Sequence, residues 1–222
     1  QRAVFKTFNQ GLDLLKYSNV RMEAHLHGIG PNGLPLDGAA DRGRVRLFVR
    51  LGANETDDFY EIEQPLTPTN LAALTGSDAA AATIWRDEVN ALNVQLSALN
   101  LLRTQRDQAG LSPARIVYHR RPDGTEDPRF SIDDAFGVPG MRLGIKGSPS
   151  LNRVTSIVIG LRADSLLNGP GDVLSDVVLW ANELRVAGYD AAQGWSAIAN
   201  ADVAFADLAT VRGSFRHQTD GF

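Results

Sequence analysis

The chain has 222 residues, of which 43% are hydrophobic and 22% charged, a balance typical of globular domains with a packed core. The net charge is only -4, and the Lys and Arg residues are scattered, which argues against a nucleic-acid partner. The absence of cysteine excludes disulfide frameworks and thiolate chemistry.

Alternation with a period of two residues dominates the first third of the chain. Residues 20–27 (VRMEAHLH) predict a half-buried strand, and residues 44–52 (RVRLFVRLG) predict a second one. Residues 59–66 (FYEIEQPL) follow a short turn and should pair with the second strand as a hairpin. We expect the glutamates of this hairpin to meet its arginines across a solvent-exposed face.

The middle of the chain mixes short helical signals with strands. Residues 69–76 (TNLAALTG) predict a helical turn, and the alanine-rich residues 76–83 predict a loop. Residues 90–99 (NALNVQLSAL) alternate as a strand does, and residues 99–110 then predict one or two helical turns that Gly110 ends.

Further strands follow towards the C-terminus. Residues 114–132 predict a hairpin about Pro122, and residues 141–147 and 153–162 predict two strands. Residues 177–186 (VVLWANELRV) predict the last strand of this set. Seven or eight short strands with little helix favour an all-β fold, a β-sandwich of jelly-roll type with short helical turns.

The residues after Trp195 follow a different pattern. Residues 196–218 predict two strands about Asp207, with large apolar residues on one side, namely Val203, Phe205, Val211 and Phe215. A soluble strand and a lipid-facing barrel strand both produce such alternation, and the pattern alone favours the soluble one. We therefore predict a sandwich domain over residues 1–195 and a C-terminal β-hairpin that begins within residues 196–222.

Candidate reactive groups lack the partners that catalysis or metal binding needs. No serine lies in a nucleophile elbow. His25 and His27 point the same way from one strand, but no third ligand is spaced for a metal, so solvated surface imidazoles are favoured. The acidic turn with Glu55, Asp57 and Asp58 offers oxygens to calcium, but its spacing matches no calcium loop. We expect no metal and no cofactor.

Aromatic residues suggest an alternative function, that of a carbohydrate-binding module. Trp85, Tyr118, Trp180 and Trp195 could form a platform on which sugars stack. Trp180 lies in the strongest apolar run and is expected in the core, which leaves Trp85 and Trp195 as contacts. Glu183 is the only carboxylate suited to glycoside hydrolysis and has no second member, so an enzyme is not expected.

Five sequence stretches taken together resemble the SprA family, also called Sov. They are DLLKYSNVRMEAHLH, RLFVRLGANETDDFYEIEQPL, SLNRVTSIVIGLRA, VVLWANELRVAGYD and GWSAIANADVAFADLATVRGSF. The resemblance runs from Asp13 to Phe215. It is most specific where residues 180–186 are followed by Gly194, Trp195 and the segment up to Val211.

The resemblance implies a structural part of a secretion machine. Members of this family are very large outer-membrane proteins of type IX secretion and gliding motility, in which a giant β-barrel conducts folded cargo. This chain would be a globular insert, exposed to the periplasm or the cell exterior, followed by the start of a barrel hairpin. Its partners would be the rest of the translocon barrel, secreted protein cargo, and accessory lipoprotein or plug subunits. Arg212 and Arg216 would then face the lumen.

The resemblance also suggests a role for the polar residues of the last sandwich strand. Asn182, Glu183 and Arg185 interrupt a strand that also carries Trp180 and runs towards Trp195. We expect Glu183 and Arg185 to pair with each other or across strands, and Asn182 to bind an adjoining loop. These residues would fix the register and exit direction of the strand rather than catalyse a reaction. The family offers no catalytic residues to carry over.

Overall fold

The computed structural model describes residues 1–71, 83–85, 87–132, 139–189, 196–205 and 209–218. The chain divides into two compact units, Gln1–Tyr189 and Asp190–Phe222, which are treated separately below. Antiparallel sheets form a sandwich in the first unit, and the second unit contains a hairpin. The predicted all-β sandwich is therefore confirmed.

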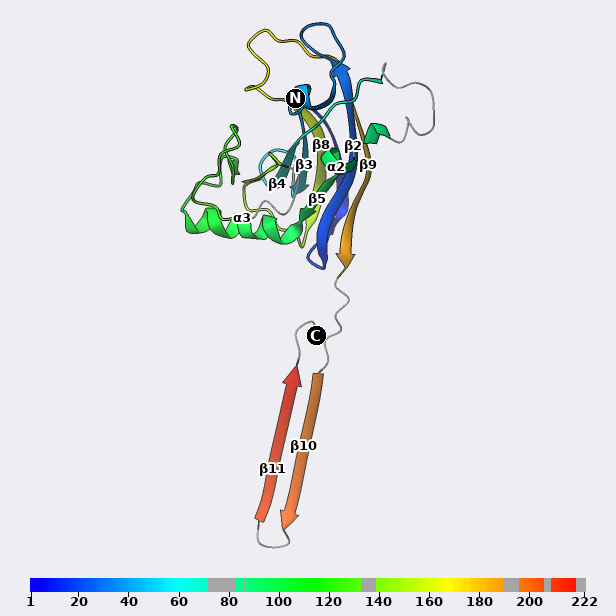
Figure 1. The fold of residues 1–222 in the computed structure, drawn as a ribbon. Helices are drawn as coiled ribbons and strands as arrows, with labels where there is room; N and C mark the ends of the chain where they lie inside the picture. The colour runs from blue at the N-terminus through cyan, green and yellow to red at the C-terminus, as the bar shows by residue number, and fades with distance from the viewer. Residues whose placement is uncertain (72–82, 86, 133–138, 190–195, 206–208, 219–222) are drawn as a thin grey trace. The chain divides into compact units, whose positions relative to one another are not determined.

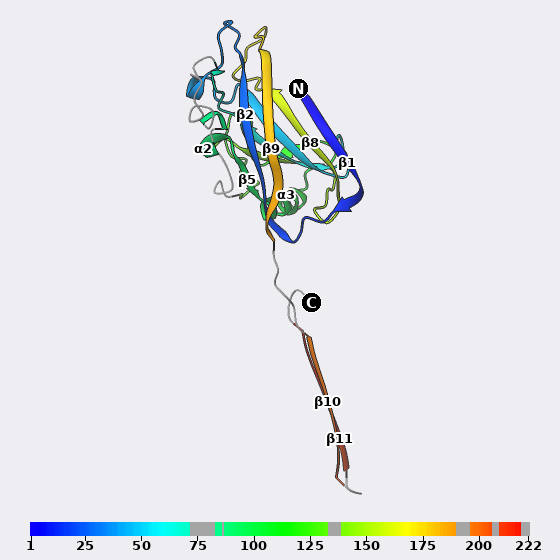
Figure 2. The same cartoon turned by 90° about the vertical axis from the view of Figure 1, so that its right-hand side faces the viewer.

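The larger sheet of the sandwich has six antiparallel strands. Their order is β1 (Arg2–Leu12), β8 (Val154–Ala163), β3 (Val45–Gly52), β4 (Phe59–Pro65), β7 (Arg142–Lys146) and β6 (Val117–Tyr118). The predicted hairpin of β3 and β4 is confirmed, because Val49 pairs with Ile62 and Arg50 pairs with Glu61. Strand β1 was not predicted, and it forms one edge of this sheet (Figure 2).

The smaller sheet has three strands in the order β5 (Leu92–Gln95), β2 (Tyr17–Ile29) and β9 (Ser175–Tyr189). Strands β2 and β9 run side by side over most of their length (Figure 1). Strand β9 thus forms the edge of this sheet in the described part of the chain.

Helical segments connect the strands. They are η1 (Gly38–Asp41), η3 (Thr83–Trp85), α2 (Asp87–Asn90) and α3 (Leu96–Gln108). The strand predicted over residues 90–99 ends early, because Leu96, Leu99 and Leu102 form a buried stripe with helical spacing. Gly110, with a φ of 64°, follows the end of α3 as predicted. The predicted hairpin about Pro122 is reduced to a tight turn with a single bridge between Arg120 and Glu126.

The hydrophobic core lies between the two sheets and extends beneath α3. Alternate residues of β2, β3, β4 and β7 are fully buried there, together with the apolar stripe of α3. Helix α3 packs against β7 and β2, so it covers part of the large sheet that the three-stranded sheet leaves open. The opposite margin of the large sheet, at β1, has no such cover from a helix in the described residues.

The second unit contains the hairpin of β10 (Ser196–Phe205) and β11 (Ala209–Gln218). Its register runs from Ser196 paired with Gln218 to Phe205 paired with Ala209. The predicted turn residue Asp207 lies outside the described residues. The register pairs Val203 with Val211, and Phe215 is 60% exposed. The expected lipid and lumen faces stay predictions.

Candidate functional site

The outer face of the large sheet carries a charged layer. Period-two alternation places its members on the face opposite the core, because their strand neighbours are the buried apolar residues. The charged layer consists of four arginines, two glutamates and one tyrosine: Arg46, Arg50, Glu61, Glu63, Tyr118, Arg142 and Arg162.

Each glutamate of the charged layer accepts several hydrogen bonds. Glu63 accepts from the Nε of Arg46 at 2.6 Å, from the Nε of Arg142 at 2.6 Å, and from Arg162. Glu61 accepts from the Nε of Arg50 at 2.7 Å and from Nη1 of Arg162 at 3.0 Å. Both glutamates are 0% exposed. The expectation that these charges lie on a solvent-exposed face was therefore wrong.

Aromatic rings and glycines explain this burial. Phe48 lies between two guanidinium groups, with its ring centre 5.2 Å from Arg50 and 4.9 Å from Arg162. Phe48 also lies opposite Gly160 on the neighbouring strand, where the missing side chain leaves room for the ring. Tyr118 is paired with Gly144 in the same way. The rings and the arginine stems together exclude water from the carboxylates.

Burial and neighbouring charges shift the pKa values of Glu63 and Tyr118 in the charged layer. Burial raises the pKa of Glu63, but the hydrogen bond and charge of Arg142, with the charges of Arg46 and Arg162, outweigh it and hold the pKa below its ordinary value. Burial and the charge of Glu61 raise the pKa of Tyr118. The hydroxyl of Tyr118 donates a hydrogen bond to Glu61. The charged layer thus pairs buried carboxylates of β4 with guanidinium groups of β3, β7 and β8 in the large sheet.

The polar residues of β9 lie at the surface. Glu183 and Arg185 form an ion pair with each other, and their side chains are 54% and 51% exposed. Asn182 is exposed and opposite Glu23 in register. Trp180 is 43% exposed, so its expected place in the core was wrong. Trp195 lies outside the described residues, and the proposed effect of this set on the exit of the strand stays a prediction.

Glu183 has a distinctive backbone conformation. Its φ is 52°, in the left-handed region that L-residues rarely adopt. The strand bulges there, because β9 has two residues between the partners of Arg21 and Glu23 whereas β2 has one. A bulge re-aims a strand, so the backbone of Glu183 rather than its exposed carboxylate sets the local geometry.

Because of the bulge, we expect two substitutions of Glu183 to differ in their effect on stability. Glu183→Gly is expected to keep the free energy of unfolding within about 0.5 kcal/mol, because glycine adopts positive φ without strain. Glu183→Val is expected to lower it by about 1–2 kcal/mol, because a β-branched residue is strained there. Urea denaturation measures both, and equal losses would refute a role for the backbone.

A cluster of histidine and tryptophan rings lies on the face of β2 and β9 that points away from the core. His25 is 0% exposed, so it is not the solvated imidazole that was expected. Its Nδ1 lies 2.8 Å from the carbonyl oxygen of Ile84, and its Nε2 lies 3.1 Å from Nδ1 of His27. The Trp180 ring lies 4.8 Å from His25 and 6.4 Å from Trp85 between centres. Within the described residues, no three or more acidic, His or Cys side chains are grouped to hold a metal.

The acidic turn between β3 and β4 uses its polar groups for its own structure. The side-chain oxygen of Asn54 accepts hydrogen bonds from the amides of Thr56 at 3.0 Å and Asp57 at 2.7 Å. The carboxylate of Asp57 binds Lys146 at 2.8 Å, and that of Asp58 accepts from the amide of Ser148 at 2.7 Å. This arrangement is that of an ordinary acidic turn.

Asn90 has a structural role that no sequence pattern indicated. Asn90 is fully buried, and its side chain both accepts from the amide and donates to the carbonyl of Thr67, at 2.8 Å each. Gln64 adds a bond from its side chain to the carbonyl of Asn90, also at 2.8 Å. These partners are 23 or more residues apart, so spacing alone could not bring them together.

A comparison with family models shows which family the chain resembles over its full length. The model SprA_N, described as motility related/secretion protein, matches residues 1–222. No curated protein matches, and no solved structure matches. Among the described residues, no helix has both the length and the apolar character to cross a membrane.

Proposed function

Because the chain belongs to the SprA_N family of motility related/secretion proteins, we propose that it is a structural, non-enzymatic domain of an outer-membrane protein-export translocon. The translocon is of the type IX secretion and gliding-motility kind. The family match over all 222 residues is the observation that carries this proposal. Its partners are the rest of the translocon barrel, secreted cargo and accessory lipoprotein or plug subunits.

The structure supports a scaffolding role in two ways. The charged layer covers the outer face of the large sheet with arginine–glutamate ion pairs that connect its strands. Such connections are expected of a rigid scaffold without a reactive centre. The hairpin of β10 and β11 forms a compact unit separate from the sandwich. We assign the sandwich as the insert and the hairpin as a part of the barrel.

Replacement of residues 2–189 by a flexible linker in the chromosomal copy tests this function. We expect the bacterium to lose export of cargo into the medium and spreading on agar, because the translocon lacks its scaffold. Restoration of the natural segment at the same locus is the control. Unchanged export and spreading in the replacement strain would contradict the proposal. Protease accessibility on intact cells then reports which side of the outer membrane the sandwich occupies.

Carbohydrate binding is the second candidate, and the half-exposed Trp180 beside Trp85 favours it. Binding to a glycan array that disappears in Trp180→Ala would support a carbohydrate-binding module in place of the scaffold.

A further inference from the structure

The sandwich is open along one side, where the large sheet extends beyond the small one. In the described part of the chain, β1 pairs only with β8, and β9 pairs only with β2. Two pockets of about 470 and 490 Å³ lie between these edges. We call this surface the β1–β9 groove; both pockets are lined by residues of β1, β8 and β9.

The β1–β9 groove has an apolar floor and wall. Ile159 and Leu161 of β8 form part of the floor, and Val177 and Val186 of β9 form part of the wall. These four side chains are only partly buried, at the margin of the core. Extended peptides present alternate side chains to one face, so a strand lying in the groove would bury every second side chain on this apolar surface.

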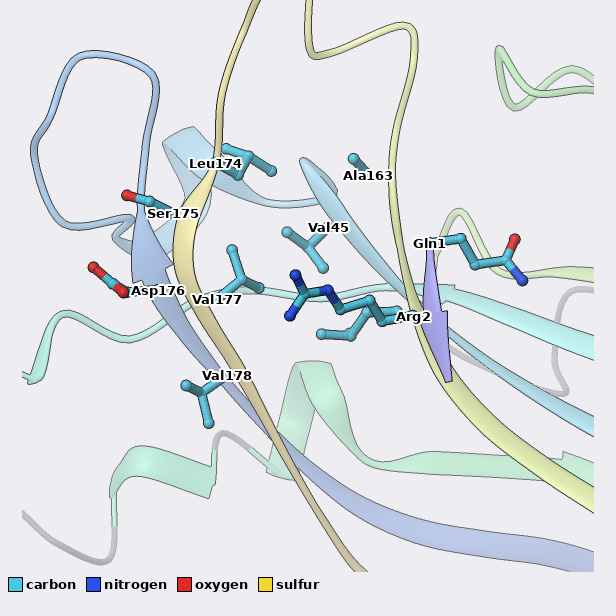
Figure 3. A pocket seen from close by; sticks show the side chains of 10 residues that line it. Gln1, Arg2, Val45, Ala163, Leu174, Ser175, Asp176, Val177 and Val178 are labelled. Carbon is cyan, nitrogen blue, oxygen red and sulfur yellow. The ribbon is translucent and has the colours of Figure 1, made fainter. Parts of the chain in front are cut away.

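Two exposed cations of β1, Arg2 and Lys6, line the two pockets. Neither forms an ion pair within the described residues, although Asp176 also lines the first pocket. Figure 3 shows the Arg2 side chain extending into the first pocket towards Val177, whereas Gln1 points away. The amino group of Lys6 lies 5.6 Å from the centre of the Phe8 ring. An extended ligand that presents carboxylates as well as apolar side chains therefore complements the groove.

Strand β9 offers backbone groups at its outer edge between two bulges. The register with β2 shifts at Asp176, with a φ of 50°, and again at Glu183, with a φ of 52°. Bulges limit pairing at the edge of a sheet. The regular stretch from Val178 to Asn182 lies between them, and it is the part of β9 that can accept a further strand.

We propose that the β1–β9 groove binds an extended segment of a partner protein whose groove-facing side chains are alternately acidic and apolar. The segment pairs with Val178–Asn182 of β9, its apolar side chains lie on Ile159 and Leu161, and its carboxylates, on the same face, meet Arg2 and Lys6. A second copy of this chain is a poorer occupant, because symmetric docking of the same face would oppose Arg2 and Lys6 with cations.

The test uses two synthetic peptides and the 222-residue chain. The acidic peptide is acetyl-TETVTETVT-amide, whose glutamates and valines share one face and whose glutamates are spaced as Arg2 and Lys6 are; the control peptide has lysine in place of both glutamates. We expect fluorescence anisotropy to give about tenfold tighter binding of the acidic peptide. We also expect amide hydrogen exchange to slow in Val178–Asn182 when it binds.

The double substitution Arg2→Glu and Lys6→Glu supplies the matched variant, since both side chains are exposed. It should reverse the preference towards the lysine peptide. Equal binding of the two peptides, an unchanged preference in the variant, or unchanged exchange in Val178–Asn182 would each overturn the proposal. A dimer in sedimentation experiments, formed because a second copy occupies this face, would also overturn the proposal.

Discussion

Glu63→Gln is expected to lower the free energy of unfolding by about 3–5 kcal/mol, because it removes one partner of a buried ion network and leaves the other charges uncompensated. Glu63 is fully buried and binds Arg46, Arg142 and Arg162, so three guanidinium groups lose a carboxylate at once. Urea denaturation at neutral pH measures the loss. Glu183→Gln is the matched control, because its ion pair with Arg185 is about half exposed. It should cost less than about 1 kcal/mol, and similar losses in both variants would contradict the importance of burial.

The same variant should change how stability depends on pH. The pKa of Glu63 is lower in the folded chain than in the unfolded chain. Its contribution is therefore complete above the unfolded pKa and is lost as the pH falls through the folded value. The natural chain should lose stability below about pH 5 more steeply than Glu63→Gln. Parallel curves from pH 7 to pH 3 would show that Glu63 carries no such linkage.

Gly160→Val is expected to lower the free energy of unfolding by about 3 kcal/mol, because it overfills a packed face. A Cβ atom at Gly160 would lie 2.3 Å from the Cζ of Phe48 and 2.7 Å from the Cβ of Ala3. Phe48 cannot move aside without leaving its place between Arg50 and Arg162. Thermal and urea denaturation measure the loss.

The control for this substitution is Gly169→Val, in a loop where the nearest atoms to an added Cβ lie 3.8 Å away. It should change stability by less than about 0.5 kcal/mol. The second variant Phe48→Leu, combined with Gly160→Val, should recover part of the loss because the smaller side chain leaves room. Additive losses in the double variant would show that the ring and the new side chain do not compete.

The hairpin of β3 and β4 could be predicted because its signal is local. Alternation and a short turn lie within residues 44–66, and the pairs of Arg50 with Glu61 and Phe48 with Glu63 follow from them. The burial of the glutamates could not be predicted. It depends on Arg142 and Arg162, which are 79 and 101 residues away from their partners Glu63 and Glu61, and no spacing rule reaches so far.

Other differences between the sequence predictions and the structure have local causes. Strand β1 mixes cations with apolar residues, and most of it is exposed on both faces, so neither a core period nor a turn indicates it. Leu96 fits both the strand alternation before it and the helical stripe after it, which hid the start of α3. The two-residue spacing of Glu183 and Arg185 predicted that they share a face. The positive φ of Glu183 could not be predicted, because a glutamate in a sequence does not indicate such a backbone conformation.

The opposed faces of β4 determine how the sandwich responds to tension. A slip of β4 by one residue would put Glu61 and Glu63 into the hydrophobic interior and Ile62 among the arginines. No partly shifted arrangement is favourable, so the central strands cannot yield by sliding in small steps. Under a pulling force the sheet should keep its strand pairing up to a threshold force and then unfold in a single cooperative step.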